Sequence, residues 1–128
     1  MLSDSKAFFS FSIDDVQKAK QFYGETLGLN ANQTPEGLRL DLTGGATGFL
    51  YPKPNHQAAS FTVLNFPVSN IDDAVAELKK RGVKFESYDT PDLKTDANDI
   101  MRSDGKPGHG PAGIAWFKDP AGNFLSVL

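Results

Sequence analysis

The side chains in this sequence that could carry out acid/base chemistry are few. There are two histidines, His56 and His109, and no cysteine. The absence of cysteine excludes disulfides, thiolate nucleophiles and cysteine zinc sites. His56 lies in a proline-rich stretch, where we expect a solvent-exposed loop residue. His109 is flanked by two glycines in a long polar loop, so it could serve as a general base or hydrogen-bond donor.

The acidic residues are expected to be mainly structural. Asp119 comes just before Pro-Ala-Gly-Asn, where a carboxylate accepts hydrogen bonds from turn amides. Four further aspartates stand at the starts of predicted helices, where carboxylates satisfy free amides and the helix dipole: Asp14, Asp15, Asp72 and Asp73. None of the five is predicted to be catalytic.

The composition is typical of an ordinary globular domain. A chain of 128 residues with 39% hydrophobic and 23% charged residues is long enough for one core, so we expect a single domain over 1–128. No apolar run could cross a membrane and no signal-peptide pattern opens the chain, which indicates a cytoplasmic protein. The net charge of −3, without a basic cluster, argues against nucleic-acid binding.

A strand–helix–strand pattern occurs twice. Residues 8–13 alternate as a strand, and Asp14 with Gln17 resembles a capping box that begins a helix ending at Gly28. Further strand patterns follow up to Tyr51, of which the first is weak and the later ones are regular. A shift of about fifty-five positions superposes Ile13-Asp14-Asp15-Val16 on Val68-Ser69-Asn70-Ile71, which is the signature of an internal repeat.

The second copy has the same order of elements. A strand over 59–68 precedes a helix that a Ser69–Asp72 pattern begins and Gly82 ends, and a strand over 83–88 follows. The polar stretch 89–111 is expected to be a functional lid or a mobile loop. The predicted modules are about 6–52 and about 59–128, and neither could bury its helix face alone.

Three stretches resemble the vicinal oxygen chelate superfamily, which includes glyoxalases, bleomycin-resistance proteins and extradiol dioxygenases. They are Phe11 to Leu29 with its Phe-Tyr-x-x-x-Leu-Gly pattern, Phe66 to Val83, and Phe117-Lys118-Asp119-Pro120-Ala121-Gly122-Asn123. The resemblance implies an α+β fold in which two pseudo-symmetric βαβββ modules form one curled mixed sheet around a cleft. It also implies a homodimer.

The resemblance further implies four metal-ligand positions, one on each of four strands. In this sequence they fall at Phe8, Val63, Leu50 or Tyr51, and Ser126. Phe, Val and Leu have no ligand atom, and neutral Tyr and Ser hydroxyls bind divalent ions poorly. We therefore predict no metal and no cofactor.

The same strands are expected to line a cleft for an organic ligand. Ser10 and Ser12 share strand parity with Phe8, and Asn65 shares it with Val63. The predicted cleft is aromatic and weakly polar, with the residues Phe8, Ser10, Tyr51, Val63, Asn65, Trp116 and Ser126. The competing interpretation is that Phe8, Phe11 and Trp116 are core residues.

Three functional hypotheses follow. The first is a metal-free protein that binds a small, aromatic or amphipathic organic molecule in the cleft, as the bleomycin-resistance branch implies. The second is an enzyme of the same superfamily, either with an atypical metal site or with non-metal acid/base chemistry that uses His109, Tyr51 or Ser126. The third is a degenerate member that serves only in protein association.

Overall fold

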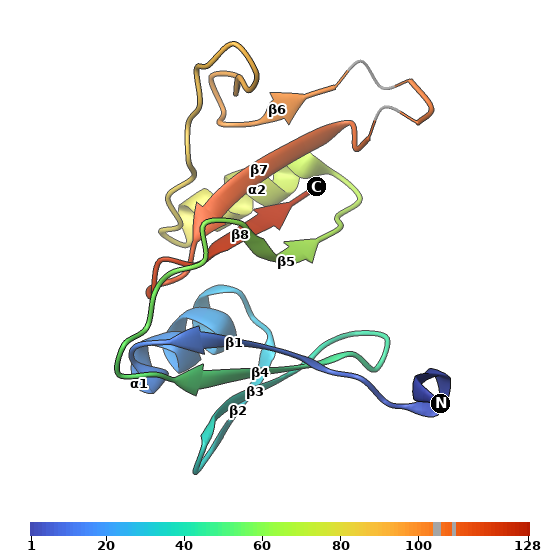
Figure 1. Ribbon diagram of the computed structural model, residues 1–128. Coiled ribbons are helices and arrows are strands. Elements are labelled where there is room, and N and C mark those ends of the chain that lie inside the picture. The colour runs from blue at the N-terminus through green and yellow to red at the C-terminus, as the bar shows by residue number, and fades with distance from the viewer. Residues whose placement is uncertain (104–105, 109) are drawn as a thin grey trace. The chain divides into compact units, whose positions relative to one another are not determined.

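The computed structural model describes residues 1–103, 106–108 and 110–128. The chain divides into two compact units, Met1–Ala58 and Ala59–Leu128, and each contains its own four-stranded mixed sheet (Figure 1). These units correspond to the two predicted modules, and the α+β class is confirmed. A single domain enclosing a cleft stays a prediction.

Module one orders its sheet β1-β4-β3-β2. β1 runs parallel to β4, and the other neighbours are antiparallel. Its elements are η1 (Leu2–Asp4), β1 (Phe9–Ile13), α1 (Val16–Lys20), the π-helical segment η2 (Gln21–Thr26), β2 (Asn30–Thr34), β3 (Gly37–Asp41) and β4 (Thr47–Pro52).

One face of this sheet packs against its helix. Tyr23 of η2 is fully buried, and its ring lies 6.4 Å from that of Phe11 on β1. Leu38 and Leu50 are paired across β3 and β4 and are also fully buried. Since side chains alternate along a strand, the residues between these positions face the other side of the sheet.

Module two orders its sheet β5-β8-β7-β6 and covers one face with a longer helix. The helix packs on β7 and β8. Its contact with β7 is close, since a Cβ added at Gly113 would lie 3.2 Å from the Ile71 side chain. The elements are β5 (Thr62–Phe66), α2 (Ile71–Lys80), β6 (Met101–Arg102), β7 (Gly113–Lys118) and β8 (Phe124–Val127).

Both helices begin one residue later than predicted. Asp15 caps α1 by accepting from the Lys18 amide, and Asn70 caps α2 by accepting from the Asp73 amide. Asp14 and Ser69 therefore lie outside the helices. The same shift in both modules supports the repeat.

The strand predicted over 83–88 is not a regular strand. Only Phe85 forms a bridge, to Phe117, and the Glu86 amide donates to the Trp116 carbonyl. Farther along the same edge of β7, the two-residue strand β6 pairs with Gly113 and Ile114. The intervening loop divides the edge strand into two short segments.

Candidate functional site

Module one presents a mixed polar and aromatic sheet face away from its helix. Ser10 is paired in register with Phe49, and Ser12 with Tyr51. Partners in register point to the same side of a sheet. Tyr51 is 36% exposed, so its ring is accessible to a ligand. The structure therefore brings two of the predicted cleft residues, Ser10 and Tyr51, to one face.

A charged network continues this face onto β2 and β3. Arg39 is paired in register with Phe49, and its Nε donates to Asp41 at 3.3 Å. Asp41 also accepts from Asn32 Nδ2 at 3.1 Å. The face thus combines an aromatic centre with hydrogen-bonding groups on both sides.

His56 is not the solvent-exposed loop histidine that the sequence predicts. It is half-buried, and its Nδ1 lies 2.7 Å from the Ser12 hydroxyl oxygen. The Lys53 amide donates to the Ile13 carbonyl, and the His56 amide donates to the Lys53 carbonyl. This turn returns the imidazole to β1. The proline-rich composition of the stretch concealed the contact, because no local pattern indicates a partner 44 residues away.

Module two presents a second such face, opposite α2. Trp116 is paired in register with Ser126, and Ser126 with Asn65. Ser126 is fully buried, and its hydroxyl donates to Asn65 Oδ1 at 2.5 Å. Three of the predicted cleft residues therefore lie side by side on neighbouring strands.

Tyr88 extends this cluster and is not among the site residues predicted from the sequence. Its ring lies edge-on to the Trp116 ring with centroids 5.7 Å apart. Burial, reinforced by the negative charge of Glu86, raises the pKa of the Tyr88 phenol. Tyr88 therefore stays protonated at neutral pH and can donate a hydrogen bond. The signal that could have found it is the alternation of 83–88 beside the Trp116 strand.

The remaining predicted cleft residues are placed less clearly. Phe8 precedes β1 and is 66% exposed, so it is not a core residue. Val63 lies where the register of β5 against β8 shifts, so the side of the sheet that its side chain faces is irregular.

His109 lies outside the described residues. Phe11 faces the helix of module one, as a core residue would, whereas Trp116 does not face α2.

The residues at the four metal-ligand positions do not fit a metal ion. Phe8, Val63 and Leu50 offer no donor atom. Tyr51, the other residue predicted for the position of Leu50, offers only a phenol hydroxyl, which is a poor ligand for a divalent ion. The Ser126 hydroxyl already donates to Asn65. Within residues 1–103, 106–108 and 110–128, no group of three or more His, Cys, Asp or Glu side chains is arranged to hold a metal. Divalent ions need several such donors converging on one point.

Ion pairs fasten the described part of the long loop to α2. Arg102 donates to Asp72 on α2 and, through Nε, to Asp96 at 3.1 Å. Lys79 of α2 pairs with Asp99 at 3.1 Å, and Asp99 also accepts from Ser87.

The Arg102 hydrogen bonds lower the pKa of Asp72. Backbone amides, chiefly that of Ile100, lower the pKa of Asp96, and the Ser87 hydroxyl lowers that of Asp99.

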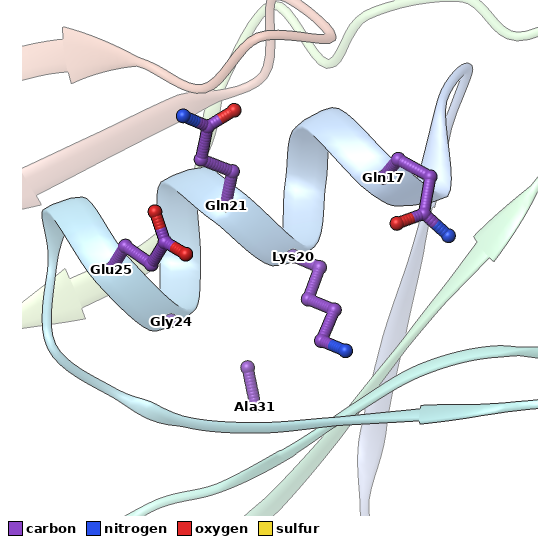
Figure 2. Close-up of a pocket in the computed structure, with 6 residues that line it drawn as sticks. All are labelled: Gln17, Lys20, Gln21, Gly24, Glu25 and Ala31. Carbon is purple, nitrogen blue, oxygen red and sulfur yellow. The ribbon is translucent and has the colours of Figure 1, made fainter.

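A separate pocket of about 420 Å³ lies along the helix of module one. Figure 2 shows Ala31 of β2 facing the helix at Gly24, and a Cβ added at Gly24 would lie 3.6 Å from that of Ala31. The other lining residues are Gln17, Lys20, Gln21 and Glu25. All seven predicted cleft residues lie elsewhere.

Asp119 has the structural role that the sequence predicts. Its Oδ1 accepts from the amides of Ala121 and Asn123, and its Oδ2 accepts from Asn123 Nδ2. Gly122 adopts a φ of 84° in this turn, a conformation that favours glycine. The Asn123 side chain in turn accepts from the Ala59 amide at the start of module two. The carboxylate therefore holds the β7–β8 turn.

Two βαβββ modules joined in one chain define an architecture that known proteins share. The family model of the Glyoxalase/Bleomycin resistance protein/Dioxygenase superfamily matches residues 7–127, and the chain belongs to this superfamily. A search of curated proteins finds no match.

Solved structures of this superfamily share the fold at low sequence identity. A glyoxalase family protein from Enterococcus faecalis is 23% identical over 99% of this chain and 98% of its own, with a TM-score of 0.62. TnmS3, an antibiotic binding protein from Streptomyces sp. CB03234, is 24% identical over 94% of this chain and 93% of its own, with a TM-score of 0.58. A glyoxalase/bleomycin resistance protein/dioxygenase from Alicyclobacillus acidocaldarius is 18% identical over 99% and 92%, with a TM-score of 0.65.

In the part of the chain that the structure describes, no helix has both the length and the apolar character needed to cross a membrane.

Proposed function

We propose that this protein binds a small aromatic or amphipathic organic molecule without a metal ion. The observation that carries the proposal is the cluster formed by Trp116, Tyr88, Asn65 and Ser126 on the sheet face opposite α2. Aromatic rings supply most of the binding energy in such sites, and a few polar groups orient the ligand.

The sheet face of module one supports the same function. Tyr51 offers a partly exposed ring, with Ser10 and Ser12 along the neighbouring strand. The fold is shared with TnmS3, an antibiotic binding protein, which makes aromatic antibiotics a suitable first set of ligands to test. A cleft shared between modules stays a prediction, as does a homodimer.

The alternative is an enzyme of the same superfamily with non-metal acid/base residues. Ser126 is a weak candidate for that role, because its hydroxyl is buried and committed to Asn65. Tyr51 keeps an accessible ring, and His109 stays a prediction from the sequence.

The single tryptophan allows a direct test. A panel of polycyclic aromatic antibiotics would be titrated while the fluorescence of Trp116 is recorded, and the melting temperature would be measured for each compound. We expect at least one compound to quench Trp116 and raise the melting temperature by mass action. Trp116→Leu should lose the melting shift.

Lys80→Ala is the matched control, because Lys80 is exposed at the end of α2 and outside the cluster. It should keep the full melting shift. A compound that raises the melting temperature equally in wild type and Trp116→Leu would place its site elsewhere and contradict the proposal.

A further inference from the structure

The hydrogen bond between Ser12 and His56 joins two residue types that form nucleophile–base pairs in enzymes. The Ser12 hydroxyl oxygen lies 2.7 Å from His56 Nδ1, and both side chains are half-buried. In the tautomer with the proton on Nε2, the hydroxyl donates to Nδ1. A serine hydroxyl in this contact can transfer its proton as it attacks a carbonyl carbon.

The backbone fixes this contact from both sides. Ser12 lies within the regular pairing of β1 with β4, opposite Tyr51. His56 follows β4 in a turn closed by hydrogen bonds from the Lys53 and His56 amides. The pair is therefore held by strand pairing and a turn, which limits the reorganisation needed for proton transfer.

The surroundings of the pair suit an aromatic ester. Tyr51 is the neighbour of Ser12 in register and is 36% exposed, and Phe49 lies two residues earlier on the same face. An aryl ring packed on Tyr51 would bring an attached ester carbonyl within reach of Ser12.

From this geometry we infer that Ser12 and His56 form a nucleophile–base pair that gives the protein an acyl-transfer activity on small aromatic esters. The Ser12 oxygen forms a bond to the acyl carbon while its proton passes to His56 Nδ1. The bond from the acyl carbon to the phenolic oxygen breaks, and the phenolate leaves. The proton on His56 passes to solvent with the departing phenolate, which restores the free base. Water then attacks the acyl carbon while His56 Nδ1 accepts its proton, and that proton passes to the Ser12 oxygen as the acyl–serine bond breaks and the carboxylic acid leaves.

The first test uses p-nitrophenyl acetate with the full chain. We expect release of p-nitrophenolate together with acetylation of the peptide that contains Ser12, located by mass spectrometry. Ser12→Ala should lose that acetylation. His56→Gln should slow it by about 10²-fold or more, the usual contribution of a general base. Asn55→Ala, an exposed neighbour of His56, should acetylate at the wild-type rate.

The second test exploits the absence of cysteine. In Ser12→Cys the only thiol of the protein replaces the proposed nucleophile, so its reaction with iodoacetamide reports on the local base. We expect this thiol to react faster than that of Ser3→Cys, an exposed position. Adding His56→Gln to Ser12→Cys should remove the difference. Circular dichroism would verify that each variant is folded.

Two results would overturn the inference. One is a wild-type protein that is not acetylated at Ser12, and the other is a thiol in Ser12→Cys whose reactivity does not depend on His56. The inference rests on the proposed function in one respect, since both need a small aromatic molecule to bind a sheet face. The ester would lie beside Tyr51 in module one, whereas the cluster that carries the proposed function surrounds Trp116 in module two. The two can be told apart, because Trp116 quenching by an unreactive antibiotic does not require Ser12 or His56.

Discussion

The hydroxyl of Ser126 donates to Asn65 Oδ1 at 2.5 Å and joins β8 to β5 on the face opposite α2. Ser126 is fully buried, so this bond satisfies a polar group that water does not reach. Superfamily members that bind a metal are expected to have a carboxylate at this position. In this chain Ser126 instead forms a hydrogen bond to the neighbouring strand and lies beside Trp116 in register.

Removing this hydrogen bond should cost stability in a measurable way. Ser126→Ala should lower the free energy of unfolding by about 1 kcal/mol, the net value of a typical hydrogen bond. Asn65→Ala should cost more, because it leaves the buried Ser126 hydroxyl without its partner. Urea unfolding would give both values.

The double variant provides the control for coupling. If the two side chains act through one bond, Ser126→Ala with Asn65→Ala should cost less than the sum of the single changes. Strict additivity within about 0.5 kcal/mol would show that the bond contributes nothing of its own.

Two glycines of module one should respond in opposite ways to alanine. A Cβ at Gly37 would collide with the Leu50 carbonyl and lie 3.1 Å from the Tyr51 Cα, so Gly37→Ala should destabilise module one by about 1–3 kcal/mol. A Cβ at Gly24 would meet only Ala31, at 3.6 Å. Gly24→Ala should be neutral or stabilise by about 0.5–1 kcal/mol, since it removes a helical glycine. Thermal unfolding would separate the two, and a more stable Gly37→Ala would contradict the β3–β4 packing.

The loop network predicts a dependence of stability on pH. The pKa values of Asp72, Asp96 and Asp99 are lowered from the ordinary value of 3.8. A carboxyl with a lowered pKa in the folded state stabilises the fold above the unfolded pKa, and this contribution is lost as the pH falls through the folded value.

Arg102→Met tests this dependence, because Arg102 contacts both Asp72 and Asp96. Its melting temperature should lie below that of wild type at neutral pH, and the two should converge as the pH falls below about 4. Salt should also reduce the difference, since the pairs are exposed. Lys80→Met, which removes a nearby exposed charge, should show no such convergence. A constant difference at all pH values would indicate lost packing alone.

The repeat and the terminal hairpin could be predicted from sequence because each has a local signal. Asp119 and Gly122 specify a local turn, in which the Asp119 carboxylate accepts from the Ala121 amide. The helix starts, capped by Asp15 and Asn70, were each predicted one residue too early. Neighbouring Asp, Ser and Asn side chains can all serve as caps, so composition does not choose between them.

The contacts that could not be predicted are those between distant segments. His56 meets Ser12 across 44 residues, and Tyr88 meets Trp116 although the segment 83–88 is not a regular strand. Strand periodicity predicts which side a residue faces, but it does not say which loop returns to cover it. The alternation of Phe8 likewise predicted a strand residue that the structure leaves exposed before β1.

The donor set at the four ligand positions predicts that the protein holds no stoichiometric divalent metal. Protein purified without chelator would be analysed by inductively coupled plasma mass spectrometry and titrated with Zn²⁺ by calorimetry. Ser126→Glu restores a single carboxylate, yet it should still bind no zinc. Phe8, Val63 and Leu50 supply no further donor, and the Tyr51 hydroxyl is a poor ligand. The buried charge should also lower its stability. About one tightly bound ion per wild-type chain would contradict the metal-free proposal and favour the enzymatic alternative.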